Sequence, residues 1–123
     1  MLKFLSDYGL LVFTVLSLAA GQILFKVASG RLQGVGVSSF LNTNFLIIMV
    51  PALIVYAIAT ITWILVLRTM PLSTAYVFVA LAFVIVPVAS IFILRETVTP
   101  IQWAGFFLIC AGVGLAGMSQ LAK

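Results

Sequence analysis

Four long runs of apolar residues follow one another along the chain, separated by short polar breaks. These runs cover residues 8–28, 45–67, 72–94 and 101–121. Each is close to the roughly 20 residues that an α-helix needs to cross the hydrocarbon core of a bilayer. A transmembrane β-strand would instead alternate lipid-facing and lumen-facing residues, whereas these runs are continuously apolar. The pattern predicts an all-α membrane protein in which residues 1–123 form a single domain, a bundle of four transmembrane helices with short loops.

The breaks between the runs carry turn and helix-capping residues. The longest break, residues 29–44, is rich in glycine and ends in Asn42-Thr43-Asn44. The break before the fourth run ends in Thr99 and Pro100, a capping residue followed by a proline that suits the first turn of a helix. Such short connections predict that consecutive helices pack side by side in antiparallel directions.

The first run has one alternative interpretation, a cleaved secretory signal. Lys3 precedes the run, and Leu18-Ala19-Ala20 has the small residues of a cleavage site. Asp7, however, lies inside the segment that a signal keeps basic, and cleavage would leave three spans starting at a polar Gly21-Gln22. We therefore interpret this run as the first transmembrane helix.

Composition narrows the chemistry that such a bundle can perform. Hydrophobic residues make up 65% of the chain and charged residues 7%, too few charges for the surface of a water-soluble domain. Six Lys/Arg against two Asp/Glu give a net charge of +4 without a basic cluster, which excludes nucleic acid as a partner. Histidine is absent and Cys110 is the single cysteine, which excludes internal disulfides and imidazole-dependent zinc or triad sites. We expect no catalytic residue, no metal and no cofactor.

The basic residues divide equally between the two sides of the membrane. With four spans both termini share one side, which carries Lys3, Arg68 and Lys123, and the other side carries Lys26, Arg31 and Arg95. Orientation normally follows an excess of Lys and Arg on the cytoplasmic side, which this chain lacks. Two hypotheses remain open: insertion in both orientations with an antiparallel dimer of opposed copies, or a single orientation set by other features.

Polar residues inside the spans are candidate binding residues, because they are costly in hydrocarbon. Gln22 and Lys26 share one face of the first helix, and Ser17 lies about one turn earlier. Lys26 either binds a ligand or extends to the membrane interface, and Gln22 either binds a ligand or hydrogen-bonds a neighbouring helix. Tyr56 lies in the middle of its span and is a cavity candidate, whereas Tyr76 lies near a span end.

Neither acidic residue lies inside a span. Asp7 stands at the entrance of the first run, and Glu96 stands in the turn before the fourth. A proton-coupled exporter of organic cations needs a buried acid, so an anion is the better match for the one deep charge, Lys26. We interpret Glu96 as a structural residue of its turn, pairing locally beside Arg95 and complementing a helix N-terminus.

The fourth run carries small residues at regular intervals. Gly105, Gly112 and Ala116 recur seven and four residues apart, the spacing that lets two membrane helices approach closely. We expect this face to serve packing or dimerisation rather than ligand binding.

Several segments together resemble the four-helix unit of the drug/metabolite transporter superfamily. The segments are Gly21-Gln22 with Lys26, Met70–Tyr76 (MPLSTAY), Pro87, Leu94–Gly105 (LRETVTPIQWAG) and Leu108–Val113 (LICAGV). Within that superfamily, the small multidrug resistance family has a glutamate where this chain has Leu18 and a tryptophan where it has Val79. The subunits of the aminoarabinose undecaprenyl-phosphate flippase are closer. They share Gly21, Gln22 and Lys26, the Trp63–Leu67 segment before Pro71, the turn from Glu96 to Pro100, and Trp103.

This resemblance implies a transporter or flippase that moves an undecaprenyl-phosphate-linked sugar, or a similar anionic polyprenyl lipid, across the bacterial inner membrane. Lys26 would attract the phosphate, Gln22 and Ser17 would hydrogen-bond head-group oxygens, and Tyr56 and Tyr76 would line the path. No bond is broken, so the resemblance implies no enzyme. The partners would be the lipid-linked sugar, membrane lipids and a second subunit, in a homodimer, parallel or antiparallel, or a heterodimer with a sister chain. Two alternatives remain: a multidrug-type exporter of lipophilic compounds with unusual coupling, and a non-transporting assembly subunit.

Overall fold

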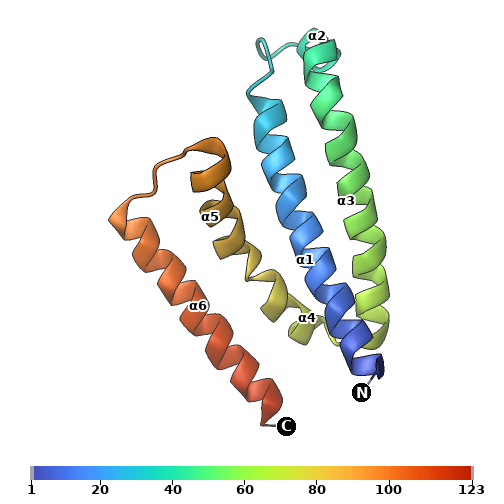
Figure 1. Cartoon of the computed structure of the whole chain (residues 1–123), viewed down its shortest axis with the longest axis vertical. Coiled ribbons are helices and arrows are strands. Elements are labelled where there is room, and N and C mark those ends of the chain that lie inside the picture. Colours follow the sequence, from blue (N-terminus) through green and yellow to red (C-terminus); the bar gives the residue numbers. More distant parts are fainter. Residues whose placement is uncertain (1, 123) are drawn as a thin grey trace.

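Six helices make up the chain in the computed structural model, which describes residues 2–122 (Figure 1). They are α1 (Leu2–Ser29), α2 (Val37–Phe40), α3 (Thr43–Thr69), α4 (Leu72–Val79), α5 (Ala82–Leu94) and α6 (Pro100–Leu121). The described residues contain no strand, which confirms the all-α prediction. The side chain of Lys3 and the whole of Lys123, both used in the charge count, lie outside the described residues.

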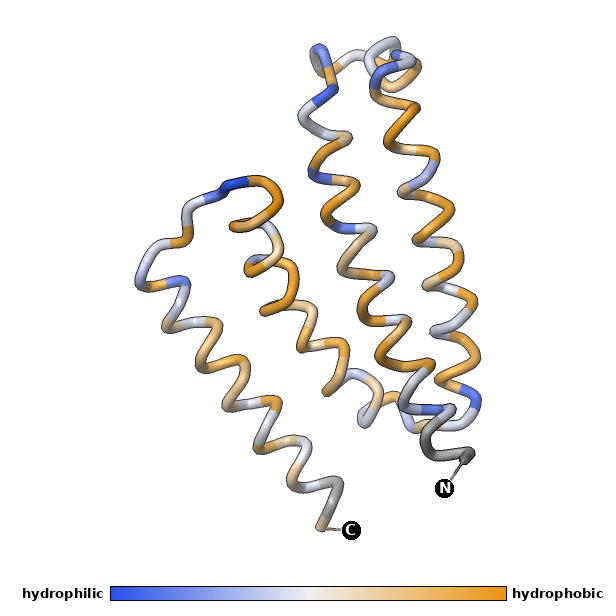
Figure 2. Tube along the Cα trace, viewed as in Figure 1, coloured by the Kyte–Doolittle hydropathy of each residue, from blue (hydrophilic) through white to orange (hydrophobic). Residues whose placement is uncertain are grey.

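Four segments of the described chain are long and apolar enough to cross a membrane. They are Ser6–Ser29, Thr43–Thr69, Leu72–Leu94 and Pro100–Ser119. Apolar residues cover most of the length of these helices, and strongly polar residues lie near the helix ends and within α1 (Figure 2). Many large apolar side chains stay exposed, as expected where the surrounding solvent is lipid. The predicted set of four transmembrane helices is confirmed.

The first two long helices, α1 and α3, lie side by side and form the best-packed part of the molecule (Figure 1). Near the N-terminal end of α1, buried Leu11 packs with Val66 and Met70. One turn further along α1, the fully buried Thr14 places its hydroxyl oxygen 2.8 Å from the Thr62 hydroxyl oxygen of α3. This hydrogen bond satisfies a polar group inside the helix pair, as a membrane interior requires.

The third span is divided into α4 and α5. The interruption lies at Ala80 and Leu81, where the Leu81 N–H donates to the Phe78 carbonyl three residues earlier. Such a bond tightens the helix locally to the 3₁₀ form. Pro87 lies inside α5 and Pro51 inside α3, so the interruption is not at a proline.

The last helix, α6, leans away from the α1–α3 pair and contacts α4 and α5 alone among the described helices (Figure 1). A capping box starts α6: the Thr99 N–H donates to Gln102 Oε1 at 2.8 Å, and the Gln102 N–H donates to Thr99 Oγ1 at 3.4 Å. This motif, followed by Pro100, confirms the predicted helix start.

Candidate functional site

Three neighbouring pockets form a groove along α1. The Lys26 end lies between α1, α5 and the start of α6, and the other two pockets lie between α1, α3 and the α4–α5 span. The volumes of the three pockets are about 460, 440 and 220 Å³. The first two share Gln22, Val86 and Pro87, and the last two share Leu18, Tyr56 and Val79. We call these three adjoining pockets the groove. It runs from Lys26 at one end to Tyr76 at the other.

The Lys26 end of the groove is polar and carries one charge of each sign. Lys26 Nζ lies 3.3 Å from Glu96 Oε1, and the two side chains are 60% and 41% exposed. The uncharged polar residues that line the same pocket are Gln22, Ser90, Thr97 and Gln102. Because both charges remain accessible, a ligand in this pocket can reach either of them.

The turn after α5 brings Glu96 to this position. Arg95 has a φ of 54°, the left-handed conformation that side-chain-bearing residues rarely adopt. The backbone N–H groups of Arg95 and Glu96 both donate to the Ser90 carbonyl, the second at 3.4 Å. The chain thereby reverses direction, and the Glu96 carboxylate pairs with Lys26 of α1. The local pairing expected beside Arg95 is not the ion pair that forms.

Lys26 lies in the last turn of α1. A cation there is favoured by the partial negative charge of the helix C-terminus. Its pairing with Glu96 shows that the side chain turns toward the groove and the α5–α6 turn. Lys26 therefore lies where a ligand in the groove would meet it, and its role in binding stays a prediction.

The middle of the groove is mostly apolar, and its shape depends on Tyr56. The Tyr56 ring packs against Phe25, with ring centroids 5.3 Å apart. It also covers Gly21, where a Cβ atom would stand 2.9 Å from Tyr56 Cδ2. Leu18 and Val79 complete this part of the lining. Gly21 thus has a steric role that its position beside Gln22 did not reveal.

The far end of the groove is aromatic. Trp63 and Tyr76 meet edge to face, with centroids 5.8 Å apart and an interplanar angle of 69°. Both line the third pocket together with Thr60. Tyr76 is 59% exposed, so this residue remains accessible.

Four of the five predicted binding residues lie along the groove: Lys26, Gln22, Tyr56 and Tyr76. Ser17 does not line these three pockets, because it is rotated about 100° around α1 from Leu18, which does. Their roles in binding stay predictions.

Three polar residues of the Lys26 end were not predicted: Ser90, Thr97 and Gln102. Ser90 could have been predicted from the sequence, because it is the one polar residue between positions 83 and 94 of an apolar run. Thr97 and Gln102 reach the groove through the reversal of the chain at Arg95, for which no sequence signal was available.

The predicted small-residue face of α6 is uncovered in this chain. A Cβ atom added at Gly105 or Gly112 would meet nothing within 4 Å, and Ala116 is exposed. Packing within the chain therefore does not use this face.

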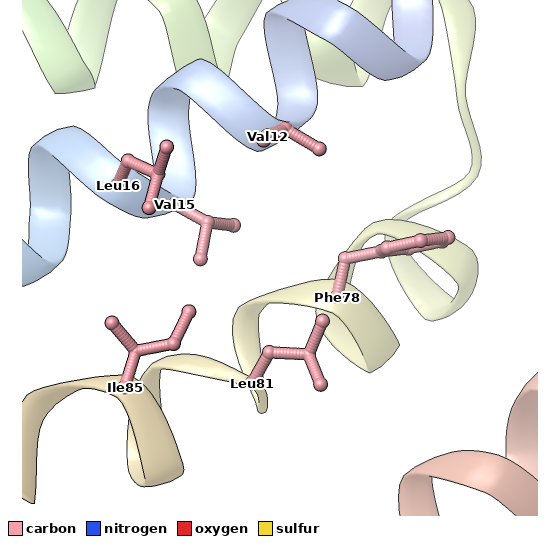
Figure 3. A pocket seen from close by; sticks show the side chains of 6 residues that line it. All are labelled: Val12, Val15, Leu16, Phe78, Leu81 and Ile85. Atoms are coloured by element: carbon pink, nitrogen blue, oxygen red, sulfur yellow. The ribbon is translucent and has the colours of Figure 1, made fainter. Parts of the chain in front are cut away.

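A smaller pocket lies on another side of α1, beside the interruption between α4 and α5 (Figure 3). It has a volume of about 60 Å³, and all its lining residues are apolar: Val12, Val15, Leu16, Phe78, Leu81 and Ile85. With no polar group to orient a ligand, this pocket is a gap in helix packing rather than a candidate site.

Comparison with curated proteins finds relatives over most of the chain. This chain is 34% identical over 108 residues to a protein of Salmonella newport (strain SL254) described as a probable 4-amino-4-deoxy-L-arabinose-phosphoundecaprenol flippase subunit ArnE. That match covers 88% of this chain and 94% of the relative. A protein of Salmonella typhimurium (strain LT2) with the same description is 34% identical over 107 residues, covering 87% of this chain and 93% of the relative. A third, from Pseudomonas fluorescens (strain Pf0-1), is 37% identical over 60 residues, covering 49% and 53% respectively.

No protein-family model matches the chain. No solved structure matches it either.

Proposed function

This chain belongs to the family of the 4-amino-4-deoxy-L-arabinose-phosphoundecaprenol flippase subunits ArnE, and from that membership we propose that it moves an undecaprenyl-phosphate-linked sugar across the membrane. It is a multi-pass protein of the inner membrane. The observation that carries the proposal is the groove, which extends from a cation at one end to accessible aromatic rings at the other.

The chemistry of such a lipid suits the two parts of the groove. The head group carries an anionic phosphate, and Lys26 offers a cation with three hydrogen-bond donors. Gln22, beside it, supplies an amide for phosphate or sugar oxygens, and Tyr56 and Tyr76 line the rest of the path. The isoprenoid tail stays in the lipid while the head group passes. Ser17 does not line the three pockets, so its proposed hydrogen bond to a head-group oxygen has no support from this geometry.

The proposed process is transport and not catalysis, since no covalent bond of the lipid-linked sugar changes. The residues act by binding and release, and the proposal requires no metal or cofactor.

The test removes the charge of Lys26. In inner-membrane vesicles from the native host, with the wild-type chain replaced by a variant, Lys26→Gln is expected to lower flipping of the lipid-linked sugar about tenfold or more. Loss of a hydrogen bond to a charged group costs about 1.5–3 kcal/mol, which corresponds to that change. Lys26→Arg should retain most of the rate.

Arg31→Gln is the matched control, because Arg31 lies in the loop after α1 and does not line the groove. Like Lys26→Gln, this substitution removes one positive charge on that side of the membrane, but it should leave flipping unchanged. Equal rates for wild type and Lys26→Gln, at matched protein levels, would rule out the phosphate role.

A multidrug-type exporter is the alternative within the same superfamily. Leu18 and Val79 line the middle of the groove, where the small multidrug resistance family has its glutamate and tryptophan. Uptake of a lipophilic cation by the same vesicles, without flipping of the lipid-linked sugar, would favour that alternative. If the vesicles showed neither activity, the result would favour a non-transporting assembly subunit.

We also propose that the chain works with a second subunit, either another copy of itself, parallel or antiparallel, or a sister chain. The uncovered small-residue face of α6, with Gly105, Gly112 and Ala116, supports this proposal, since exposed backbone there allows close approach of a partner helix. The relatives are themselves described as subunits.

A further inference from the structure

The carboxylate of Glu96 lies where an anion-binding groove should not need one. Glu96 Oε1 is 3.3 Å from Lys26 Nζ, and both residues line the same pocket. Asp7, the only other acidic residue, does not line this pocket. Glu96 is therefore the one acidic side chain at the polar end of the groove.

A carboxylate beside the lysine opposes the binding of a ligand that is only an anion. Such a ligand competes with Glu96 for Lys26, and a displaced carboxylate is left without its partner. Once a bound head group excludes water from the pocket, an unpaired charge is costly. A ligand that carries both a phosphate and an ammonium group avoids this cost, because it offers a new partner to each residue.

We propose that Lys26 and Glu96 form a divided head-group site, in which Glu96 binds the protonated amine of an amino sugar while Lys26 binds its phosphate. The inference rests on the function proposed above. The relatives' description includes a 4-amino-4-deoxy sugar joined through phosphate to undecaprenol, a head group with one charge of each sign. In the empty groove the two side chains neutralise each other, and in the loaded groove each is neutralised by the substrate.

The surroundings of the pair suit one sugar ring. The pocket measures about 460 Å³, within the usual range for small-molecule sites. Gln22, Ser90 and Thr97 offer uncharged polar groups for sugar hydroxyls. Gln102 uses Oε1 in the capping box, so its amide NH₂ group is left to donate.

Glu96 is held in place by backbone geometry and not only by its ion pair. Its N–H donates to the Ser90 carbonyl at 3.4 Å, and the capping box begins three residues later at Thr99. The turn therefore does not depend on the carboxylate, and Glu96→Gln keeps the same shape without the charge.

The test compares two lipids in vesicles from the native host: undecaprenyl phosphate linked to 4-amino-4-deoxy-L-arabinose, and the same lipid linked to L-arabinose, which has no amine. Wild type should flip the amino lipid faster. Glu96→Gln should lower the rate for the amino lipid about tenfold while leaving the rate for the arabinose lipid at or above the wild-type value. Asp7→Asn, which removes the other carboxylate, should leave both rates unchanged.

A merely structural ion pair would act differently. Glu96→Gln would then lower both rates by the same factor, and the inference would be overturned. A wild-type chain that flips both lipids at equal rates would also overturn it while the proposed function stood. A wild-type chain that flips neither lipid would overturn both. A lipid whose amine is formylated gives a readout that needs no variant: wild type should flip it as slowly as the arabinose lipid, and equal rates for the formylated and free amines would refute the role of Glu96.

Discussion

Gly21 sets the distance between α1 and the Tyr56 ring in the middle of the groove. A Cβ atom at this position would lie 2.9 Å from Tyr56 Cδ2, closer than side-chain contacts allow. The ring also packs against Phe25, with centroids 5.3 Å apart, and it borders the open space of the groove. The absence of a side chain at one residue thus determines where an aromatic wall of the groove stands.

The first prediction concerns Gly21→Ala. The added methyl group should displace Tyr56 and lower stability by about 1–3 kcal/mol, the usual cost of overpacking. Flipping should fall as well, because the displaced ring changes the groove. Thermal unfolding in detergent and the vesicle assay measure the two effects.

Gly9→Ala is the matched control in the same helix, since nothing lies within 4 Å of the added atom there. Within the single chain this substitution should not lower the free energy of unfolding, because alanine has a higher helix propensity than glycine. If Gly21→Ala proves as stable and as active as Gly9→Ala, the packing of Tyr56 on Gly21 does not shape the groove.

At the scale of elements, α1 and α3 are tied together by a polar contact inside an apolar interface. Thr14 is fully buried, and its hydroxyl oxygen lies 2.8 Å both from Thr62 Oγ1 and from the Leu10 carbonyl oxygen. Thr62 in turn donates to the Ala59 carbonyl at 3.0 Å. This chain of hydroxyl groups links the two helices that carry Lys26, Gln22 and Tyr56.

Thr14→Val should therefore weaken the α1–α3 pair. Hydrogen bonds between membrane helices contribute about 0.6 kcal/mol on average and up to about 1.7 kcal/mol. The expected loss is within this range, measured by reversible unfolding in mixed micelles. Thr60→Val is the control, because Thr60 is exposed and bonds the Tyr56 carbonyl of its own helix. Equal stability of the two variants would show that the contact between helices contributes nothing.

At the scale of the whole molecule, one side of the bundle is left without a partner. α6 contacts only α4 and α5 among the described helices, and its Gly105, Gly112 and Ala116 face is uncovered. The six basic residues divide three against three between the two sides of the membrane, counting Lys3 and Lys123 from the sequence alone. The uncovered face of α6 and the equal division of basic residues between the two sides are compatible with either a parallel or an antiparallel pair of subunits.

Cross-linking tests the proposed contact. In a Cys110→Ser background, Gly112→Cys should form a disulfide-linked species of two subunits when membranes are oxidised. Native Cys110 is the control, because it is exposed but lies about 200° around the helix from Gly112. The wild type should therefore cross-link poorly. Equal cross-linking at both positions, or none at Gly112→Cys, would remove the small-residue face as the site where two copies of this chain meet.

The sequence by itself determined the four spans, the class of fold and the family resemblance. Hydropathy and length are local properties, so Thr43–Thr69 is apolar enough to cross the membrane whatever packs against it. The capping box at Thr99 and the shared helix face of Gln22 and Lys26 are also local, because they depend on intervals of three or four residues.

Only the tertiary structure decided which of these residues meet. Glu96 pairs with Lys26 rather than beside Arg95 because a left-handed residue reverses the chain after α5. Ser17 falls outside the groove and Leu18 inside it because the packing of α1 against its neighbours determines which side of the helix faces the groove. Contacts between distant segments depend on the path of the backbone between them, which no pattern of apolar and polar residues records. The polar end of the groove, with its paired charges, is therefore a product of the fold.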